Sequence, residues 1–85
     1  MSEVERDAHL KANYELAERN GTRYLGTLAA EINALGLEPG SYVIIDAMTG
    51  KYVTGGSRRA ARNRFREEYP DAIGWACRIE DVPNA

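Results

Sequence analysis

Arginine is concentrated in one short segment of this sequence, where its spacing could support binding chemistry. The arginines are Arg58, Arg59, Arg62, Arg64 and Arg66, and they precede Glu67 and Glu68. In a helix this order opposes the dipole, which favours acids in the first turn and bases in the last by roughly 0.3–1 kcal/mol for each charge. Arg58, Arg62 and Arg66 also recur at every fourth position, so like charges share one helix face and repel. A sequence selected only for stability would not choose this charge order.

Several functions are compatible with such a helix face. Arg58, Arg59, Arg62 and Arg66 could dock on an acidic surface of a partner protein. They could instead neutralise nucleic-acid phosphates, although the net charge is −2 and no base-reading motif is present. Ser57, Arg58 and Arg59, at the helix N-terminus, could hold a small anion through amides and guanidinium groups. A solvated face without a binding role is the remaining alternative, because arginine is a good helix former.

Residues suited to catalysis or metal binding are few. His9 is the only histidine, and no nucleophile is expected near it. Cys77, the only cysteine, shares the large apolar face of a predicted strand with Trp75 and Ile79, as is typical of a buried, inert thiol. Asp46 ends a predicted strand and suits turn capping better than metal ligation. The break at residues 55–57 lacks the lysine and the spacing of a P-loop. The sequence therefore predicts a protein that is not an enzyme and that uses no metal or cofactor.

The composition favours a small cytoplasmic domain. The chain has 85 residues, of which 44% are apolar and 28% are charged, and this suits a single domain over residues 1–85. No stretch approaches the roughly 20 apolar residues of a membrane span. The acidic segment at residues 1–7 lacks the apolar region of a secretory signal. A single cysteine fits a reducing compartment, so we expect a cytoplasmic protein without membrane contact.

The first part of the chain, residues 1–37, is predicted to form a helical hairpin. Residues 3–20 carry a loose, alanine-rich apolar stripe, and Asn20-Gly21 is a typical helix stop. A second helix over residues 22–35 carries an apolar seam at spacings of three and four. The seam residues are Leu25, Leu28, Ile32 and Leu35. The first helix is too narrow to cover this seam, so we predict a homodimer interface there. The alternative is an ordinary helix that faces the chain's own core.

The second part, residues 38–80, is predicted to form a β-β-α-β unit, followed by a frayed tail at residues 81–85. The expected elements are strands at 41–46 and 51–54, a helix at 58–69 capped by Ser57, and a strand at 73–79. A right-handed crossover makes the last strand antiparallel to the first. The first strand is apolar on both faces, which places it at the centre of a three-stranded sheet of order 2-1-3. The predicted fold class is therefore α+β.

The predicted helix at 58–69 can cover only one face of this sheet. Its apolar stripe consists of Ala61, Phe65 and Tyr69. The other face must be covered by the N-terminal helices, by a second copy or by a partner protein. Trp75 lies on the face of the last strand that carries large residues, so we expect it to be buried against Phe65 or against the N-terminal helices.

Residues 40–79 resemble a family of short prokaryotic domains of unknown function. The features that carry the resemblance are Gly40-x-Tyr42-Val43-x-Ile45-Asp46, a hairpin with Gly50, the Gly55-Gly56 break, a helix that ends at Tyr69-Pro70-Asp71, and a final apolar strand. In that family a β-hairpin is followed by a helix and a strand. Some members look like antitoxin or partner proteins encoded beside a toxin or a protease. The resemblance implies a bacterial protein-binding module, antitoxin-like or an adaptor, and it includes no catalytic motif.

Overall fold

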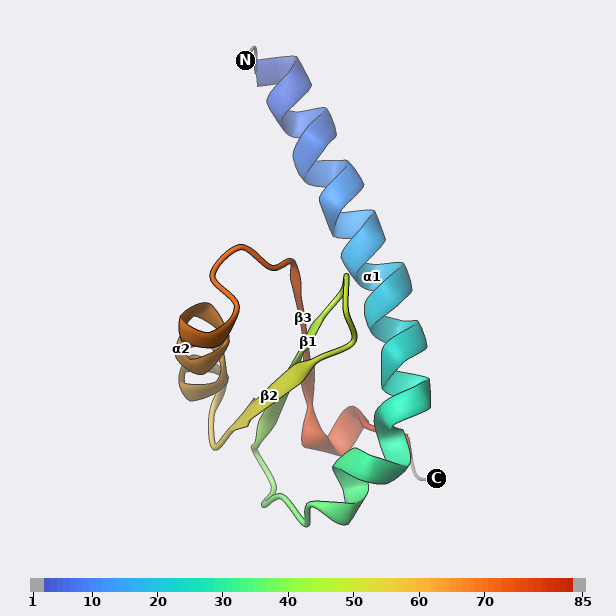
Figure 1. Ribbon diagram of the computed structural model, residues 1–85, viewed down its shortest axis with the longest axis vertical. Coiled ribbons are helices and arrows are strands. Elements are labelled where there is room, and N and C mark those ends of the chain that lie inside the picture. The colour runs from blue at the N-terminus through green and yellow to red at the C-terminus, as the bar shows by residue number, and fades with distance from the viewer. Residues whose placement is uncertain (1–2, 84–85) are drawn as a thin grey trace.

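The computed structural model describes the backbone of residues 3–83 and the side chains of residues 15–83. The elements, in chain order, are α1 (Glu3–Ala34), β1 (Tyr42–Asp46), β2 (Tyr52–Gly55), α2 (Arg58–Glu68), β3 (Gly74–Arg78) and the short 3-10 helix η1 (Ile79–Asp81). The sheet lies between α1 on one face and α2 on the other (Figure 1). The fold is therefore α+β, as the sequence predicts.

The predicted N-terminal helical hairpin is wrong, because residues 3–34 form one continuous helix. Asn20 and Gly21, the expected helix stop, lie inside α1. A Cβ at Gly21 would stand only 2.3 Å from Cγ of Trp75, so the absence of a side chain lets β3 approach the helix. Asn20 Nδ2 donates to the carbonyl oxygen of Ala47 at 2.9 Å. The pair that resembles a stop signal is the place where α1 docks on the sheet.

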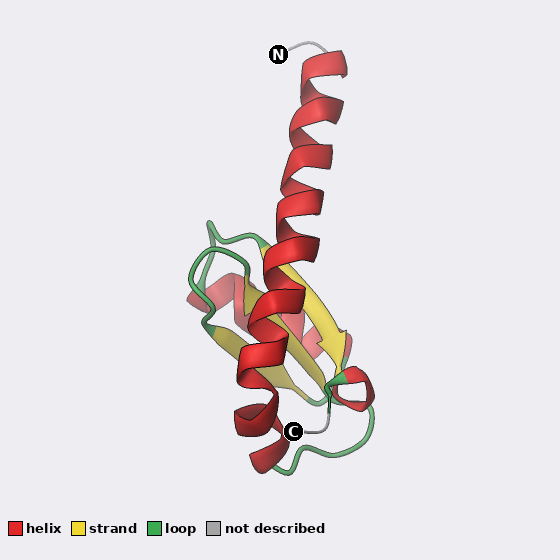
Figure 2. Cartoon of the chain, turned by 90° about the vertical axis from the view of Figure 1, so that its right-hand side faces the viewer, coloured by secondary structure: helices red, strands yellow, loops and turns green. Residues whose placement is uncertain are grey.

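The C-terminal half of α1 covers the sheet, while its N-terminal half extends beyond it (Figure 2). Ala17 is the first of the described side chains to be buried. The side chain of His9 lies outside the described part of the chain. In the portion of the molecule that the structure describes, no helix has the length and apolar character needed to cross a membrane.

The predicted strand order is confirmed, with β1 at the centre of an antiparallel sheet of order β2-β1-β3. The register places Ile44 opposite Val53 on β2 and opposite Ala76 on β3. Val43 and Ile45 face α1 and are fully buried, and Ile44 faces α2. Because β1 is covered on both faces, its sequence is a continuous apolar run rather than an alternating one.

The apolar seam of α1 packs on the chain's own sheet. Leu25 and Ile32 are buried, and Leu28 packs against the same core. Leu35 remains 51% exposed. The alternative of a helix that faces the chain's own core therefore holds for the first three seam residues, because α1 lies across this face of the sheet. Homodimerisation stays a prediction, but these three side chains do not present a free interface for it.

The packing of α2 on the opposite face confirms the predicted apolar stripe. Ala61 and Phe65 are buried with Ile44 and Val53 in a second core cluster. A Cβ at Gly55 would stand 2.4 Å from the backbone nitrogen of Ala61, so the helix backbone lies directly against β2 at this glycine. This close contact fixes which side of α2 faces solvent.

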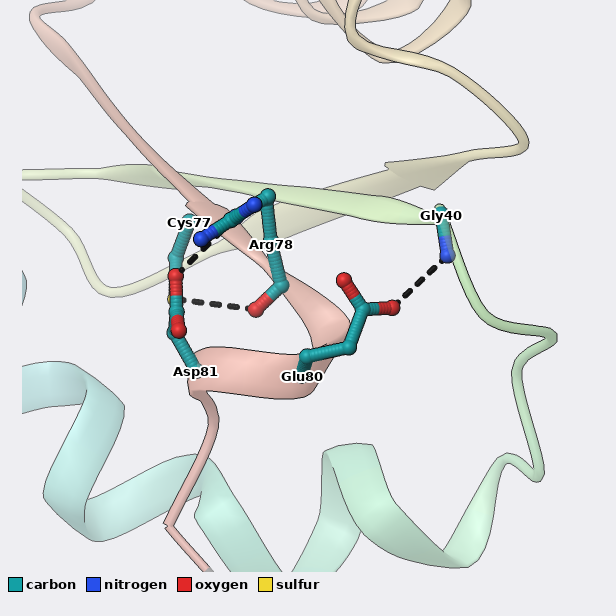
Figure 3. A network of polar contacts seen from close by, with 5 residues as sticks. All are labelled: Gly40, Cys77, Arg78, Glu80 and Asp81. Atoms are coloured by element: carbon teal, nitrogen blue, oxygen red, sulfur yellow. Dashed lines mark hydrogen bonds and ion pairs between the residues drawn. The ribbon is translucent and has the colours of Figure 1, made fainter.

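Residues 81–83 of the predicted tail pack against the domain, in contrast to the expected fraying, and residues 84–85 lie outside the described part of the chain. Val82 is buried in the core on the α1 side. The Glu80 carboxylate accepts a hydrogen bond from the Gly40 backbone N–H at 2.7 Å (Figure 3). Asn33 of α1 donates to the carbonyl oxygen of Pro83 at 2.7 Å. One buried valine and these two hydrogen bonds hold the segment against the domain.

Candidate functional site

The candidate site begins with the local structure of α2. Ser57 is its N-cap, as predicted, and the serine Oγ accepts from the backbone N–H of Ala60 at 3.1 Å. Burial of Ala61 and Phe65 turns the opposite side of the helix toward solvent. Four arginines of α2 are therefore displayed on exposed surface together: Arg58, Arg59, Arg62 and Arg66.

Among the described side chains, one arginine of α2 forms an ion pair with a neighbour. Arg64 Nε lies 3.7 Å from a Glu68 carboxylate oxygen, and Arg64 Nη1 also donates to the Thr54 carbonyl at 3.4 Å. The other ion pair among the described side chains joins Arg78 to Asp81. Within the same part of the chain, the remaining α2 arginines have no carboxylate within ion-pair distance. Their positive charge is available for a ligand.

A groove of about 370 Å³ runs between α2 and β3. Arg58, Arg62 and Arg66 line one side of it, and Gly74 and Ala76 of β3 lie on the other. The groove exists because α2 packs mainly over β2 and β1 and leaves β3 less covered. Apolar atoms from the second core cluster complete the lining, with Ile44, Phe65, Tyr69 and Ala72 among them.

The small residues of β3 shape the floor of this groove. A Cβ at Gly74 would stand 2.9 Å from Phe65 Cε1 and 3.0 Å from Ile44 Cγ2, so the glycine makes room for the phenylalanine ring. Ala76 is exposed beside it. The alternation of large and small residues in this strand indicates two unlike faces, but sequence alone does not show that the small face borders the arginines.

The predicted binding residues divide into two groups. Arg58, Arg62 and Arg66 come together at the groove. Arg59 does not line this groove, and it lies with the same three arginines along a second hollow on the surface of α2. The Ser57 hydroxyl is engaged in capping the helix. Three of the five predicted binding residues thus line the groove. Its lining also includes Gly74 and Ala76, which the sequence did not indicate.

The surroundings of Cys77 and Asp46 indicate that both residues stabilise the fold. Cys77 is buried, and burial, with a smaller effect from Asp81, raises the pKa of its thiol. Its Sγ donates to the Arg78 carbonyl oxygen at 3.2 Å (Figure 3). Asp46 accepts from the Met48 N–H at 2.9 Å and from the Thr49 hydroxyl at 2.8 Å, which confirms its turn-capping role. No group of three potential metal ligands from His, Cys, Asp and Glu occurs among the side chains described.

The chain matches no protein-family model, no curated protein and no solved structure. The resemblance of residues 40–79 to short prokaryotic domains therefore stays an expectation drawn from the sequence.

Proposed function

We propose that this protein is a non-catalytic binding module that holds an acidic segment of a partner protein in the groove beside α2. One observation carries the proposal. Arg58, Arg62 and Arg66 line a groove whose floor is apolar, and no carboxylate of the described chain pairs with them. Guanidinium groups bind carboxylates well because their planar donors match the carboxylate oxygens.

The groove lining favours a protein segment over nucleic acid. Tyr69, Ala72 and Ala76, which are partly or fully exposed, supply apolar surface that a sugar-phosphate backbone would not use, whereas a peptide carries both charged and apolar side chains. The net charge of −2 also gives no general attraction for a polyanion. Nucleic-acid or phosphate binding through the same arginines is the alternative function. The resemblance to antitoxin-like and adaptor proteins adds support for a protein partner, and the single buried cysteine suits a cytoplasmic location.

A pair of adjacent arginines offers a matched test of the proposal. Arg58 and Arg59 both lie in the first turn of α2, where a glutamate suits the helix dipole. Only Arg58 lines the groove. We expect Arg58→Glu to weaken binding of a fluorescent glutamate-rich peptide by about five- to tenfold, because an attraction becomes a repulsion. Arg59→Glu should change the affinity by less than about twofold.

Fluorescence anisotropy at two salt concentrations measures both variants and the wild type. A short duplex DNA of similar charge serves as the competing probe. Strong binding of the DNA with a steep salt dependence, and none of the peptide, would favour the nucleic-acid alternative. Equal peptide affinities for Arg58→Glu and Arg59→Glu would show that the groove is not the binding site.

A further inference from the structure

β3 is one of the two edge strands of the sheet, and the hydrogen-bond register shows which of its backbone groups point outward. The Ile79 N–H donates to Ser41, and Ala47 donates to the Ile73 carbonyl, each at 2.9 Å. In an antiparallel ladder the residues that bond to the neighbouring strand alternate. Trp75 and Cys77 therefore bond to β1. The backbone groups of the intervening residues point away from the sheet.

These outward residues are Gly74, Ala76 and Arg78, and all three are exposed. Natural sheets protect their edges with charged side chains, proline, bulges or a covering segment. Glycine and alanine provide no such protection. The guanidinium of Arg78 is held by Asp81, with Nε 3.3 Å from the carboxylate (Figure 3). The edge is therefore open, and it borders the arginine-lined groove.

We propose that the acidic partner segment binds as an added fourth strand on β3, with carboxylates at alternate positions facing Arg58, Arg62 and Arg66. This inference rests on the proposed function and specifies how the ligand is held. Side chains of a strand alternate between the two faces of a sheet. An added strand would lie about 4.8 Å beyond β3, so every second side chain would be on the α2 side.

The repeat distances of the two elements also match. Arginines four residues apart in a helix repeat about every 6 Å along its axis. Side chains on one face of a strand repeat about every 6.6 Å. The three arginines line the same groove as Gly74 and Ala76, so a strand with an acidic residue at every second position can meet more than one of them.

Charge disfavours a second copy of this chain as the occupant of the edge. In a symmetric antiparallel pairing of two β3 strands, the two-fold axis would place both α2 helices on the same side of the joined sheet. Arg58, Arg62 and Arg66 of each copy would then approach those of the other, and no carboxylate among the described side chains pairs with these arginines. An acidic segment from another protein removes this repulsion.

Peptide probes test strand addition without altering the protein. The parent peptide alternates Glu and Thr over roughly eight residues, enough to span an average strand. Its control has the same composition in the order Glu-Glu-Thr-Thr, which places acids on both faces. We expect the control to bind about five- to tenfold more weakly, because about half of its carboxylates point away from the arginines. Equal binding of the two peptides would overturn strand addition.

N-methylated versions of the parent peptide test the backbone bonds. One version is methylated at the glutamates and the other at the threonines. An added strand bonds through only one of its edges, so one version alone should lose affinity, by about tenfold or more. Loss of affinity in the version methylated at the glutamates indicates antiparallel addition. Loss of affinity in the version methylated at the threonines indicates parallel addition. If both versions bind like the parent while Arg58→Glu weakens all of them, the edge is not used but the proposed function stands.

Ala76 gives the corresponding test on the protein. Ala76→Pro removes an outward N–H, and proline is tolerated on an edge strand at such a position. We expect about a tenfold loss of affinity for the parent peptide, with Ala76→Ser unchanged as the control that keeps the N–H. Amide exchange measured by NMR on the wild type should show Gly74 and Ala76 slowed by the peptide. Unchanged exchange would overturn strand addition. If exchange at these amides is slow without peptide and the protein has the mass of a dimer, a second copy occupies the edge. That result would also overturn strand addition by a partner segment.

Discussion

The two edges of the sheet differ in how closely α2 packs against them. At the β2 edge, Arg64 reaches over the strand and donates to the Thr54 carbonyl, and α2 packs closely at Gly55. At the β3 edge, Gly74 and Ala76 are exposed beneath an arginine-lined groove. Small residues are present at both edges. They bring a helix into contact at one edge and leave space at the other, so the effect of a small residue depends on what lies opposite.

The largest expected loss of stability comes from disturbing the contact between α2 and the β2 edge. Gly55→Ala would place a Cβ 2.4 Å from the backbone nitrogen of Ala61, and neither backbone can move without separating α2 from β2. We expect a loss of about 2–3 kcal/mol in the free energy of unfolding, as in other overpacked sites. Urea denaturation measures it. Gly56→Ala is the control, because no heavy atom lies within 4 Å of its added Cβ, and similar losses for both variants would refute this account of the β2 edge.

The second-largest loss of stability is expected where α1 packs against β3. Gly21→Ala would place a Cβ within 2.6 Å of three Trp75 atoms and push β3 away from α1. We expect a loss of about 1–3 kcal/mol, measured by thermal or urea unfolding. Gly26→Ala, at an exposed helical position with open space, should instead stabilise the protein by about 0.5–1 kcal/mol. Equal and small effects at both glycines would show that α1 does not dock through Gly21.

A smaller effect is expected from opening the β2 edge directly. Arg64→Ala removes both the bond to the Thr54 carbonyl and the exposed ion pair with Glu68. We expect a loss of about 0.5–1 kcal/mol. Peptide binding at the groove should be unchanged, since Arg64 is not part of its lining. A loss of peptide affinity comparable to that of Arg58→Glu would mean that the two edges are not separate surfaces.

The smallest expected effect is a pH dependence on β2. The Tyr52 hydroxyl donates to the Glu31 carboxylate at 2.7 Å, and burial together with that carboxylate raises the pKa of Tyr52. The folded state thus holds this proton more tightly than the unfolded chain, where the pKa is about 10. The stabilisation is complete below about pH 10 and is lost as the pH rises through the folded pKa. Urea unfolding at about pH 8 and about pH 10.5 should show a smaller alkaline loss in Tyr52→Phe than in the wild type. Equal losses would contradict this.

The charge order of α2 suggested a set of candidate binding arginines, and the structure reduced that set. Spacing alone nominated Arg58, Arg59, Arg62 and Arg66 because charge, period and helix dipole are local properties. In the structure Arg58, Arg62 and Arg66 line the groove beside β3, and Arg59 does not. The structure also shows that Glu68 neutralises Arg64. Which arginines share a groove depends on where β3 lies, and no local pattern contains that information.

Other features of the fold followed from the sequence because their causes lie within a few residues. Alternation and apolar period predicted the strands and the buried face of α2, and Ser57 marked the start of that helix. The position of β1 was also predictable, because a strand that is apolar on both faces must be covered on both.

Tertiary structure decided the features whose causes are distant in the chain. Gly21 lies inside α1 instead of ending it, and Trp75 packs on the helix surface that the missing side chain leaves open. The apolar seam with Leu25 and Ile32 covers the chain's own sheet. Val82, in a segment that was expected to fray, is buried in that core. In each case local preference is worth about 1 kcal/mol or less, and burial of a large apolar side chain, worth about 1.5–3 kcal/mol, outweighs it.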